Sequence, residues 1–291
     1  MNVLLKSTGL LCALFAGVAL HAQLALELTV PRPLYLEYER IIVKVKMRNY
    51  SGQPLVFGRD ERLSGKLLFE ITLNGKTVAP IPGTEYPMTG TILQPGETRE
   101  FLVQLSRYYK LTQPGIYNVH AYVKHQLLPN DYKSQDRRFE VTPGVKAWSR
   151  TVGVPELLSS ALEGERDRIS ERTYEIRTII NSADRLYYLV VEDPKHIYAV
   201  MPVGRMVGME TFRAEIDMLS RLHLLAPVSP KLFRYYVVGL DGRIESTGMY
   251  KTDKTTPSLF RQPDTGKVGV VGGAEARVGI DYNEPEAAER P

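Results

Sequence analysis

The chain has 291 residues, a formal net charge of +4 and one cysteine; 43% of its residues are hydrophobic and 24% are charged. These values are typical of an ordinary globular protein, and they exclude a wholly disordered chain or a collagen-like repeat. The length allows one or two domains, each large enough to bury a core.

The first 22 residues have the pattern of an export signal. Lys6 precedes an apolar run from Leu10 to Leu20, and small residues then follow where a signal peptidase would cut. We expect cleavage after Ala22, with Ala19 as the alternative. The run is shorter than the ~18 residues of a transmembrane anchor, and no later segment is long and apolar enough to span a bilayer. We therefore expect a periplasmic or secreted protein.

Removal of this signal peptide changes the charge and the cysteine count. Lys6 is its one charged residue, so 36 of the 37 basic residues remain against 33 acidic ones, a net charge of +3. Such a balance indicates no nucleic-acid partner. Cys12 leaves with the signal, and the bulky Leu11 before it disfavours lipidation. The mature chain then has no cysteine for a disulfide, a thiol nucleophile, a Cys-ligated zinc or an iron–sulfur cluster.

Residues 24–145 show the two-residue period of β-strands, interrupted by turn residues. In one strand a basic row lies on the face opposite the apolar residues, and its members are Arg40, Lys44, Lys46 and Arg48. We interpret this row as a solvated sheet face, with an acidic polymer as the alternative partner. Asn74 and Gly75 form a pair typical of tight hairpins. About seven strands in some 120 residues predict an antiparallel β-sandwich.

The same alternation predicts which side chains of one strand are buried. Between Tyr117 and Val123, the residues Tyr117, Val119 and Val123 fall on one face. Asn118 and His120 fall on the other face, so we expect them to point away from the core.

Two segments of this region carry a family resemblance. They are VKVKMRNYSGQPLVF from Val43 to Phe57 and LQPGETREFLVQLSRYYKLTQPGIYNVHAYV from Leu93 to Val123. They resemble immunoglobulin-like domains of bacterial exported proteins, and are similar to the amino-terminal domain of deuterolysin-type metallopeptidases and to intracellular proteinase inhibitor domains. The most distinctive pattern is formed by Tyr109, Leu111, Pro114, Gly115, Tyr117 and Val119. The resemblance implies an immunoglobulin-like sandwich over residues 24–145 and no particular activity.

The remaining chain is expected to form a junction and a second domain. Residues 146–172 are predicted to be a junction with a short helix between Pro155 and Arg172. Residues 173–282 return to the strand period and predict a second antiparallel β-domain, with a hairpin turn at Asp241-Gly242. Residues 283–291 are polar and are expected to be a disordered tail. The predicted fold class is therefore all-β.

The search for catalytic motifs gives mainly negative results. The chain lacks the His-Glu-x-x-His motif, so the resemblance to deuterolysin-type peptidases does not imply peptidase activity. It also lacks the Gly-x-Ser-x-Gly motif of serine hydrolases. The glycine-rich segment from Gly266 to Gly273 lacks the hydroxyl residue and helix of a phosphate loop, and is interpreted as an edge strand and turn. Asp193-Pro194 predicts a turn. Glu215 and Asp217 are a weak candidate for the pair of catalytic carboxylates of a glycosidase. We expect no cofactor and no metal.

Two pairs of adjacent tyrosines, Tyr187-Tyr188 and Tyr235-Tyr236, are the feature that favours a binding site. Neighbouring residues of a strand point to opposite faces, so each pair places an aromatic ring on both faces of its strand. Either protein covers both faces, or one tyrosine of each pair is exposed for a ligand. The predicted contact residues are Trp148, Tyr187, Tyr188, Tyr235 and Tyr236.

These observations predict an exported, non-enzymatic binding or scaffold protein of the bacterial cell envelope, with an envelope protein or a glycan as its partner. Two alternatives remain open. One is an enzyme with dispersed catalytic residues in the second domain, around His196, His223 and Asp217. The other is a proteinase inhibitor that presents the loop from Pro80 to Gly90.

Overall fold

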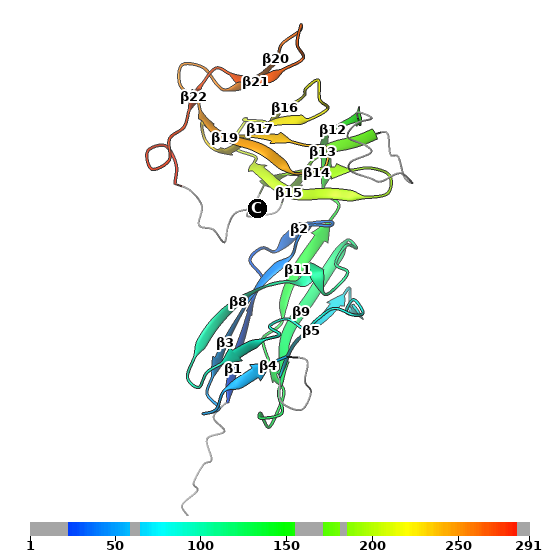
Figure 1. The fold of residues 1–291 in the computed structure, drawn as a ribbon, viewed down its shortest axis with the longest axis vertical. Coiled ribbons are helices and arrows are strands. Elements are labelled where there is room, and N and C mark those ends of the chain that lie inside the picture. Colours follow the sequence, from blue (N-terminus) through cyan, green and yellow to red (C-terminus); the bar gives the residue numbers. More distant parts are fainter. Residues whose placement is uncertain (1–22, 59–64, 155–170, 181–184, 284–291) are drawn as a thin grey trace, which may run out of the picture.

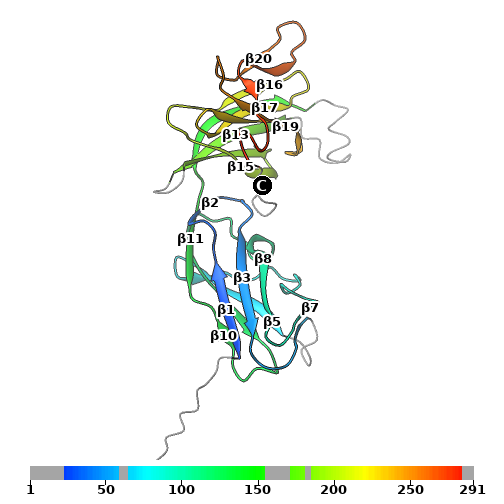
Figure 2. The same ribbon diagram turned by 90° about the vertical axis from the view of Figure 1, so that its left-hand side faces the viewer.

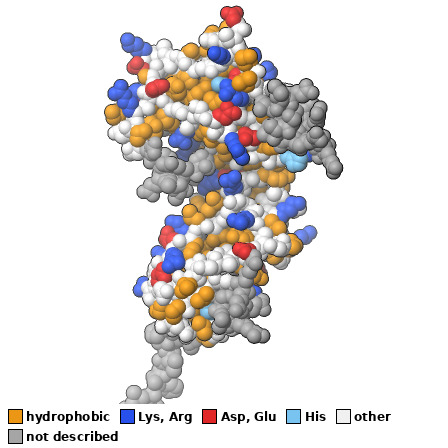
Figure 3. Space-filling model, in the orientation of Figure 1, with side chains coloured by type: hydrophobic (Ala, Val, Ile, Leu, Met, Phe, Trp, Pro, Cys, Tyr) orange, Lys and Arg blue, Asp and Glu red, His pale blue; other side chains and the backbone are white. Residues whose placement is uncertain are grey.

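The computed structural model describes residues 23–58, 65–154, 171–180 and 185–283. The expected export signal, the tail after residue 283 and residues 155–170 of the expected helix lie outside this part of the chain. The described chain is all-β, as predicted, and contains one short 3-10 helix, η1 (Leu105–Arg107). Its strands form two units that follow each other along the long axis of the molecule (Figures 1 and 3).

The first unit contains two larger sheets and one short strand pair. One sheet has the order β1 (Leu24–Thr29), β3 (Ile42–Asn49) and β8 (Thr98–Gln104). The other has the order β2 (Leu34–Leu36), β11 (Arg137–Thr142), β9 (Gly115–Lys124), β5 (Lys66–Leu73) and β6 (Lys76–Thr77), with β10 (Tyr132–Lys133) also paired to β9. The short pair is β4 (Leu55–Phe57) with β7 (Thr91–Leu93). One buried hydrophobic cluster joins them all.

Strand alternation places the core of the first unit as predicted. In β3, Val43, Val45 and Met47 are fully buried, whereas the basic residues between them are exposed. The hairpin between β5 and β6 turns at Asn74 and Gly75, whose φ angles of 49° and 82° are those that this turn requires.

Strand β9 confirms the predicted facing. Tyr117 and Val123 are 0% exposed and Val119 is 1% exposed, while Asn118 points to solvent. His120 also points away from the core, between the carboxylates of Glu70 and Asp136 at 3.2 and 3.1 Å.

We expect Val119→Ala to lower the free energy of unfolding by about 1–3 kcal/mol, because the truncation leaves a cavity in the core. His120→Ala should change that free energy by at most about 0.5 kcal/mol, because its two carboxylate partners are largely exposed and an exposed ion pair contributes little. Urea denaturation of the two variants measures the difference. Equal losses would contradict the facing of β9.

The second unit contains two larger sheets and a hairpin. The first sheet, here the β14 sheet, has the order β12 (Val145–Gly153), β13 (Glu171–Ile180), β14 (Arg185–Glu192) and β15 (Ile197–Arg205). The second, here the β17 sheet, has the order β16 (Arg213–Ile216), β17 (Leu222–Ser229), β18 (Leu232–Val238), β19 (Ile244–Lys251) and β22 (Ala274–Glu275). The hairpin pairs β20 (Ser258–Arg261) with β21 (Val268–Val271).

The two sheets of the second unit share one core. Alternate residues of β14 and β17 face each other across it, and they include Tyr187, Leu189, Leu222 and Leu224. The β20–β21 hairpin lies over the opposite face of the β17 sheet, next to β16 and β17 (Figure 1). The β17 sheet is therefore a middle layer.

The structure differs from the expected junction. Residues 145–153 form strand β12, which pairs with β13 along its length, so the second unit begins directly after β11. Gly144 makes this direct link possible, because its φ is +68° and a Cβ there would lie 2.7 Å from Leu36 Cδ1.

A third hydrophobic cluster joins the two units. It contains Leu36 from β2 of the first unit and Tyr188 and Val190 from the outer face of β14. Both views place β2 next to the β14 sheet (Figures 1 and 2). The Tyr188 hydroxyl accepts a hydrogen bond from Arg32 and lies 3.3 Å from a carboxylate oxygen of Glu39, which also pairs with Arg32. Both faces of β14 are therefore covered by protein.

Candidate functional site

An open cleft of about 450 Å³ lies where β12 and β16 form the outer edges of the two packed sheets. Its lining comes from three strands, and the residues are Trp148, Arg150, Val152, Gly153, Ala214, Glu215, Ile216 and Arg261. Figures 1 and 2 show β16 and β20 together at the far end of the second unit, away from the first unit.

Strand pairing explains why β12 points these side chains into the cleft. Trp148 lies opposite Ile176 and Arg150 lies opposite Tyr174 in the neighbouring strand, and both partners belong to the core. Directly opposed residues share a face of the sheet. Trp148 and Arg150 therefore face the same side as the core, but from the outermost strand, where the core ends.

Strand β16 has the same relation to the β17 sheet. Ala214 lies opposite Leu224 and Ile216 lies opposite Leu222, and both leucines are 0% exposed core residues. Ala214 and Ile216 are partly buried against the core, as is Trp148. The cleft therefore has an apolar floor that is continuous with the core.

The rim of the cleft is charged. Arg150, Glu215 and Arg261 are all exposed, and none of them has an ion-pair partner among the described residues. Two arginines of the second unit that do not line the cleft do have ion-pair partners. Arg177 pairs with Glu175 and Glu192, and Arg221 pairs with Asp217 and Glu245. The two cleft guanidinium groups and one carboxylate leave a local excess of positive charge, which attracts an anion.

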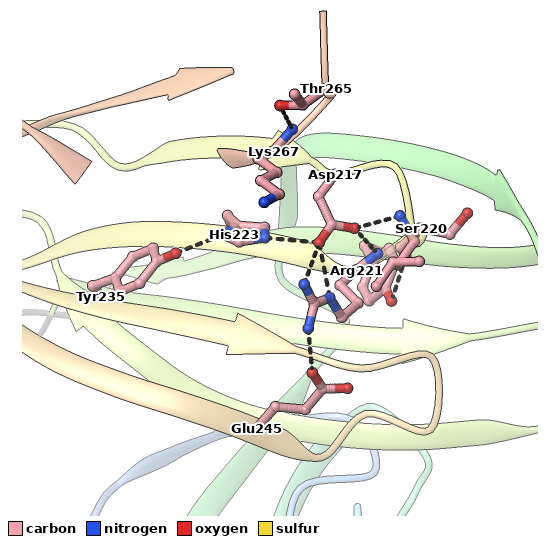
Figure 4. Close-up of polar contacts among 10 residues, drawn as sticks. Asp217, Ser220, Arg221, His223, Tyr235, Glu245, Thr265 and Lys267 are labelled. Atoms are coloured by element: carbon pink, nitrogen blue, oxygen red, sulfur yellow. Dashed lines mark hydrogen bonds and ion pairs between the residues drawn. The ribbon is translucent and has the colours of Figure 1, made fainter. Parts of the chain in front are cut away.

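A second polar cluster lies on the face of the β17 sheet that the hairpin covers (Figure 4). His223 has one ring nitrogen 3.1 Å from Asp217 Oδ2 and the other 2.5 Å from the Tyr235 hydroxyl. Asp217 also accepts hydrogen bonds from the backbone N–H groups of Leu219 and Arg221 and from the Arg221 side chain. His223 and Asp217 are 4% and 6% exposed.

The electrostatics of this cluster favour a structural role. Burial acts to raise the pKa of Asp217, but the hydrogen bonds from Arg221 and His223 outweigh it and hold that pKa below its ordinary value. Burial raises the pKa of Tyr235, so its hydroxyl stays protonated at neutral pH. Asp217 thus serves to hold the turn from Asp217 to Arg221, and neither His223 nor Tyr235 lines the cleft.

The suggested catalytic grouping is only partly formed. Asp217 and His223 do meet, but His196 lies in the turn between β14 and β15, beside Asp193. Glu215 lies opposite His223 and so shares a face with Asp217, but the Asp217 carboxylate is bonded to Arg221 and His223 and is not free to act with Glu215 as a catalytic pair.

The turn at Asp193 contains a buried ion pair that the sequence did not indicate. The side chains of Arg172 and Asp193 are both 0% exposed and lie 2.6 Å apart, and the Arg172 guanidinium lies 3.6 Å from the centre of the Tyr198 ring. Tyr198 donates a 2.5 Å hydrogen bond to the same carboxylate. The turn itself was predicted correctly, since the Asp193 N–H bonds the carbonyl of His196.

The predicted aromatic platform is wrong for Tyr187, Tyr188 and Tyr236, which are buried. Tyr187 is 3% exposed and packs on Phe212 in the core, Tyr188 is 0% exposed between the units, and Tyr236 is 4% exposed. Tyr235 is partly buried against His223 and Tyr250. Protein covers both faces of these strands, which is the first of the two alternatives. Of the five predicted residues, Trp148 is the one that lines the cleft.

The other predicted surfaces lie in the first unit. The basic row flanks a second cavity of about 330 Å³ that includes Lys46, Arg48 and Tyr50. There Arg48 stacks on Tyr50 at 4.9 Å, and Lys44 pairs with Glu100, so part of this charge is already engaged. The loop from Pro80 to Gly90 is exposed for most of its length and is anchored by the hydrogen bond from Ile81 to the Tyr108 carbonyl.

The described residues contain no group of three or more His, Cys, Asp or Glu side chains that could hold a metal ion. No helix among them is long and apolar enough to cross a membrane.

Sequence reasoning did not connect three charged residues of the cleft with Trp148. Arg150 could have been found, because it lies two positions after Trp148 on the same face of a strand. Glu215 and Arg261 come from strands that are distant in the chain, and no local pattern connects them with Trp148.

Comparisons with known proteins identify no family and include a weak structural similarity. No protein-family model matches the chain, and no curated protein matches it. Among solved structures, the chain is similar to a family 123 glycoside hydrolase from Clostridium perfringens, studied for glycolipid glycan hydrolysis, with 13% identity and a TM-score of 0.24. The match covers 42% of this chain and 27% of the hydrolase, so the chain spans about a quarter of that protein's length, and a likeness this low supports no conclusion about fold or function.

Proposed function

We propose that this protein is an exported, non-enzymatic binding protein of the bacterial cell envelope, and that its ligand occupies the cleft between β12 and β16. We also propose that the first unit is an immunoglobulin-like sandwich that carries the second unit. The observation that supports the binding site is the combination of Trp148, held against the core, with exposed guanidinium groups at the rim of the cleft.

The volume of the cleft lies within the range of small-molecule sites, although its exposed lining is more polar than that of most such sites. Such sites have an apolar floor with a few convergent polar groups and volumes of roughly 300–1,000 Å³. A tryptophan offers a large, rigid apolar surface at little cost in conformational entropy. The buried cluster around Asp217 and His223 supports binding over catalysis, because its polar atoms bond to one another and do not face the cleft.

An array of bacterial envelope glycans and peptidoglycan fragments, probed with the mature chain starting at Gln23, tests this proposal. We expect specific binding that Trp148→Ala weakens by about tenfold or more, since an aromatic anchor contributes roughly 1–3 kcal/mol. Tyr86→Ala is the matched control, because Tyr86 is also a partly exposed aromatic but lies in the first unit.

Thermal unfolding of each variant separates lost binding from lost structure. Arg150→Ala provides a second variant whose exposed side chain does not support the core. Binding that both cleft variants retain in full would overturn the assignment of the cleft, and an array without any specific signal would overturn the binding function itself.

A further inference from the structure

We infer that the ligand of the cleft is an acidic carbohydrate, with its carboxylate bound by Arg150 and Arg261 and its sugar ring on Trp148. The inference rests on the proposed function and specifies its ligand. It starts from three kinds of residue that line one cavity: two arginines, one glutamate and one tryptophan.

The guanidinium groups select an anion. Arg150 and Arg261 approach the cleft from β12 and from the end of β20, so they reach it from different strands. A guanidinium donates two parallel hydrogen bonds to a carboxylate and is weakly hydrated, which suits it to this role better than an ammonium group. Because neither group has an ion-pair partner among the described residues, a ligand carboxylate would not need to displace an internal acid.

Glu215 requires that the ligand also carry hydrogen-bond donors. It is one of the residues that line the cleft, but it lies opposite His223, so its side chain projects from the other face of β16 than Ala214 and Ile216, at the rim next to the hairpin. An ionised carboxylate only accepts hydrogen bonds, so a ligand next to it must offer hydroxyl or amide hydrogens. A simple anion such as phosphate or acetate would satisfy the arginines but not Glu215, whereas a uronic acid carries both a carboxylate and hydroxyl groups.

Trp148 adds an apolar face. Its ring is partly buried against the core cluster, so packing fixes its orientation. The C–H face of a sugar ring stacks on such a surface, and the volume of about 450 Å³ is suited to one or two sugar rings.

An extended acidic peptide fits the cleft less well. Such a peptide would bind by adding a strand to a sheet edge, with pockets for alternate side chains. β16 has only four residues, which limits the backbone hydrogen bonds it can offer. The other edge strand, β12, has nine residues, but apart from Trp148 the apolar floor consists of small or aliphatic residues and provides no pockets for alternate side chains. The favoured occupant is therefore the acidic sugar.

Trp148 is the one tryptophan of the chain, so intrinsic fluorescence reports directly on this cleft. The probes are oligogalacturonate, oligomannuronate and a glucuronate-containing disaccharide, each paired with its methyl ester, in which the charge is removed and the ring retained. We expect saturable changes in Trp148 emission with at least one acid, about tenfold weaker binding of its ester, and weaker binding as salt rises.

Variants of the two arginines test whether they cause the preference for the acid over its ester. Arg150→Gln and Arg261→Gln should each weaken binding of the acid by about tenfold and leave binding of the ester nearly unchanged. Arg107→Gln is the matched control, since Arg107 is also exposed but lies in the first unit. The melting temperatures of all three variants should stay close to that of the parent.

The outcomes separate this inference from the proposed function. Equal affinity for an acid and its ester would overturn the acidic class and leave the binding site standing. A change in Trp148 emission with a glutamate-rich peptide, and with none of the sugars, would also overturn the class and assign the cleft to a peptide. If no probe and no glycan on the array acts on Trp148, both proposals fail.

Discussion

Asp193→Asn is expected to lower the free energy of unfolding by about 3–5 kcal/mol, because it removes the carboxylate that neutralises the buried guanidinium of Arg172. The two groups are fully buried and their nearest atoms lie 2.6 Å apart. The change also weakens the turn, since Asp193 Oδ1 accepts hydrogen bonds from the N–H groups of Lys195 and His196. Chemical denaturation at pH 7 measures the loss.

Asp241→Asn is the matched control for this prediction. Asp241 also pairs with an arginine, Arg243, but at 3.4 Å, and the arginine is 87% exposed. An exposed pair contributes little, so we expect a change within about 0.5 kcal/mol. If the two substitutions cost the same, the Arg172–Asp193 pair does not stabilise the fold as its burial implies.

The same pair makes stability depend on acid pH. Burial acts to raise the pKa of Asp193, but hydrogen bonds from Tyr198, from two backbone N–H groups and from Arg172 hold it at about 2. The pKa of an aspartate in the unfolded chain is about 3.9, so between these two pKa values the unfolded chain binds more protons than the folded one. The stability from Asp193 is therefore complete above about pH 5 and is lost as the pH falls towards 2. Asp193→Asn should flatten the pH dependence of the unfolding free energy over this range.

Local patterns were sufficient to predict the all-β class and the facing of individual strands. The alternation in β9 placed Tyr117, Val119 and Val123 correctly, because a two-residue period directly reflects the geometry of a strand. The turn at Asn74 and Gly75 was also predictable, since few residue pairs adopt positive φ at low cost.

Contacts between distant segments could not be predicted in the same way. The apolar sequence of β14 is consistent with burial on both faces, but it does not show that β2 of the first unit covers one of them. Arg172 follows a run of charged residues and has the local appearance of a surface residue. Its burial depends on Asp193, which is 21 positions away. The cleft likewise forms from β12, β16 and β20, and only Trp148 was recognisable within its own segment.

Tyr188→Ala is expected to have a comparably large effect and to act on the joint between the units. Truncation of a large buried aromatic side chain costs about 3–5 kcal/mol. Tyr188 is 0% exposed and packs with Leu36 of the first unit, while its hydroxyl accepts a hydrogen bond from Arg32. Because these contacts couple two separate cores, we expect one calorimetric unfolding transition for the parent and two for the variant.

Two further variants distinguish coupling from a general loss of stability. Tyr188→Phe keeps the ring and removes the hydroxyl, so it should lose about 1–3 kcal/mol and retain a single transition. Leu36→Ala removes the contact from the side of the first unit, and it should separate the transitions as Tyr188→Ala does, because both side chains belong to the same cluster. If both alanine variants unfold in one transition, the cluster does not couple the units. The orientation of the cleft relative to the first unit would then depend on the direct link at Gly144, where a Cβ would lie 3.0 Å from the Thr178 carbonyl oxygen.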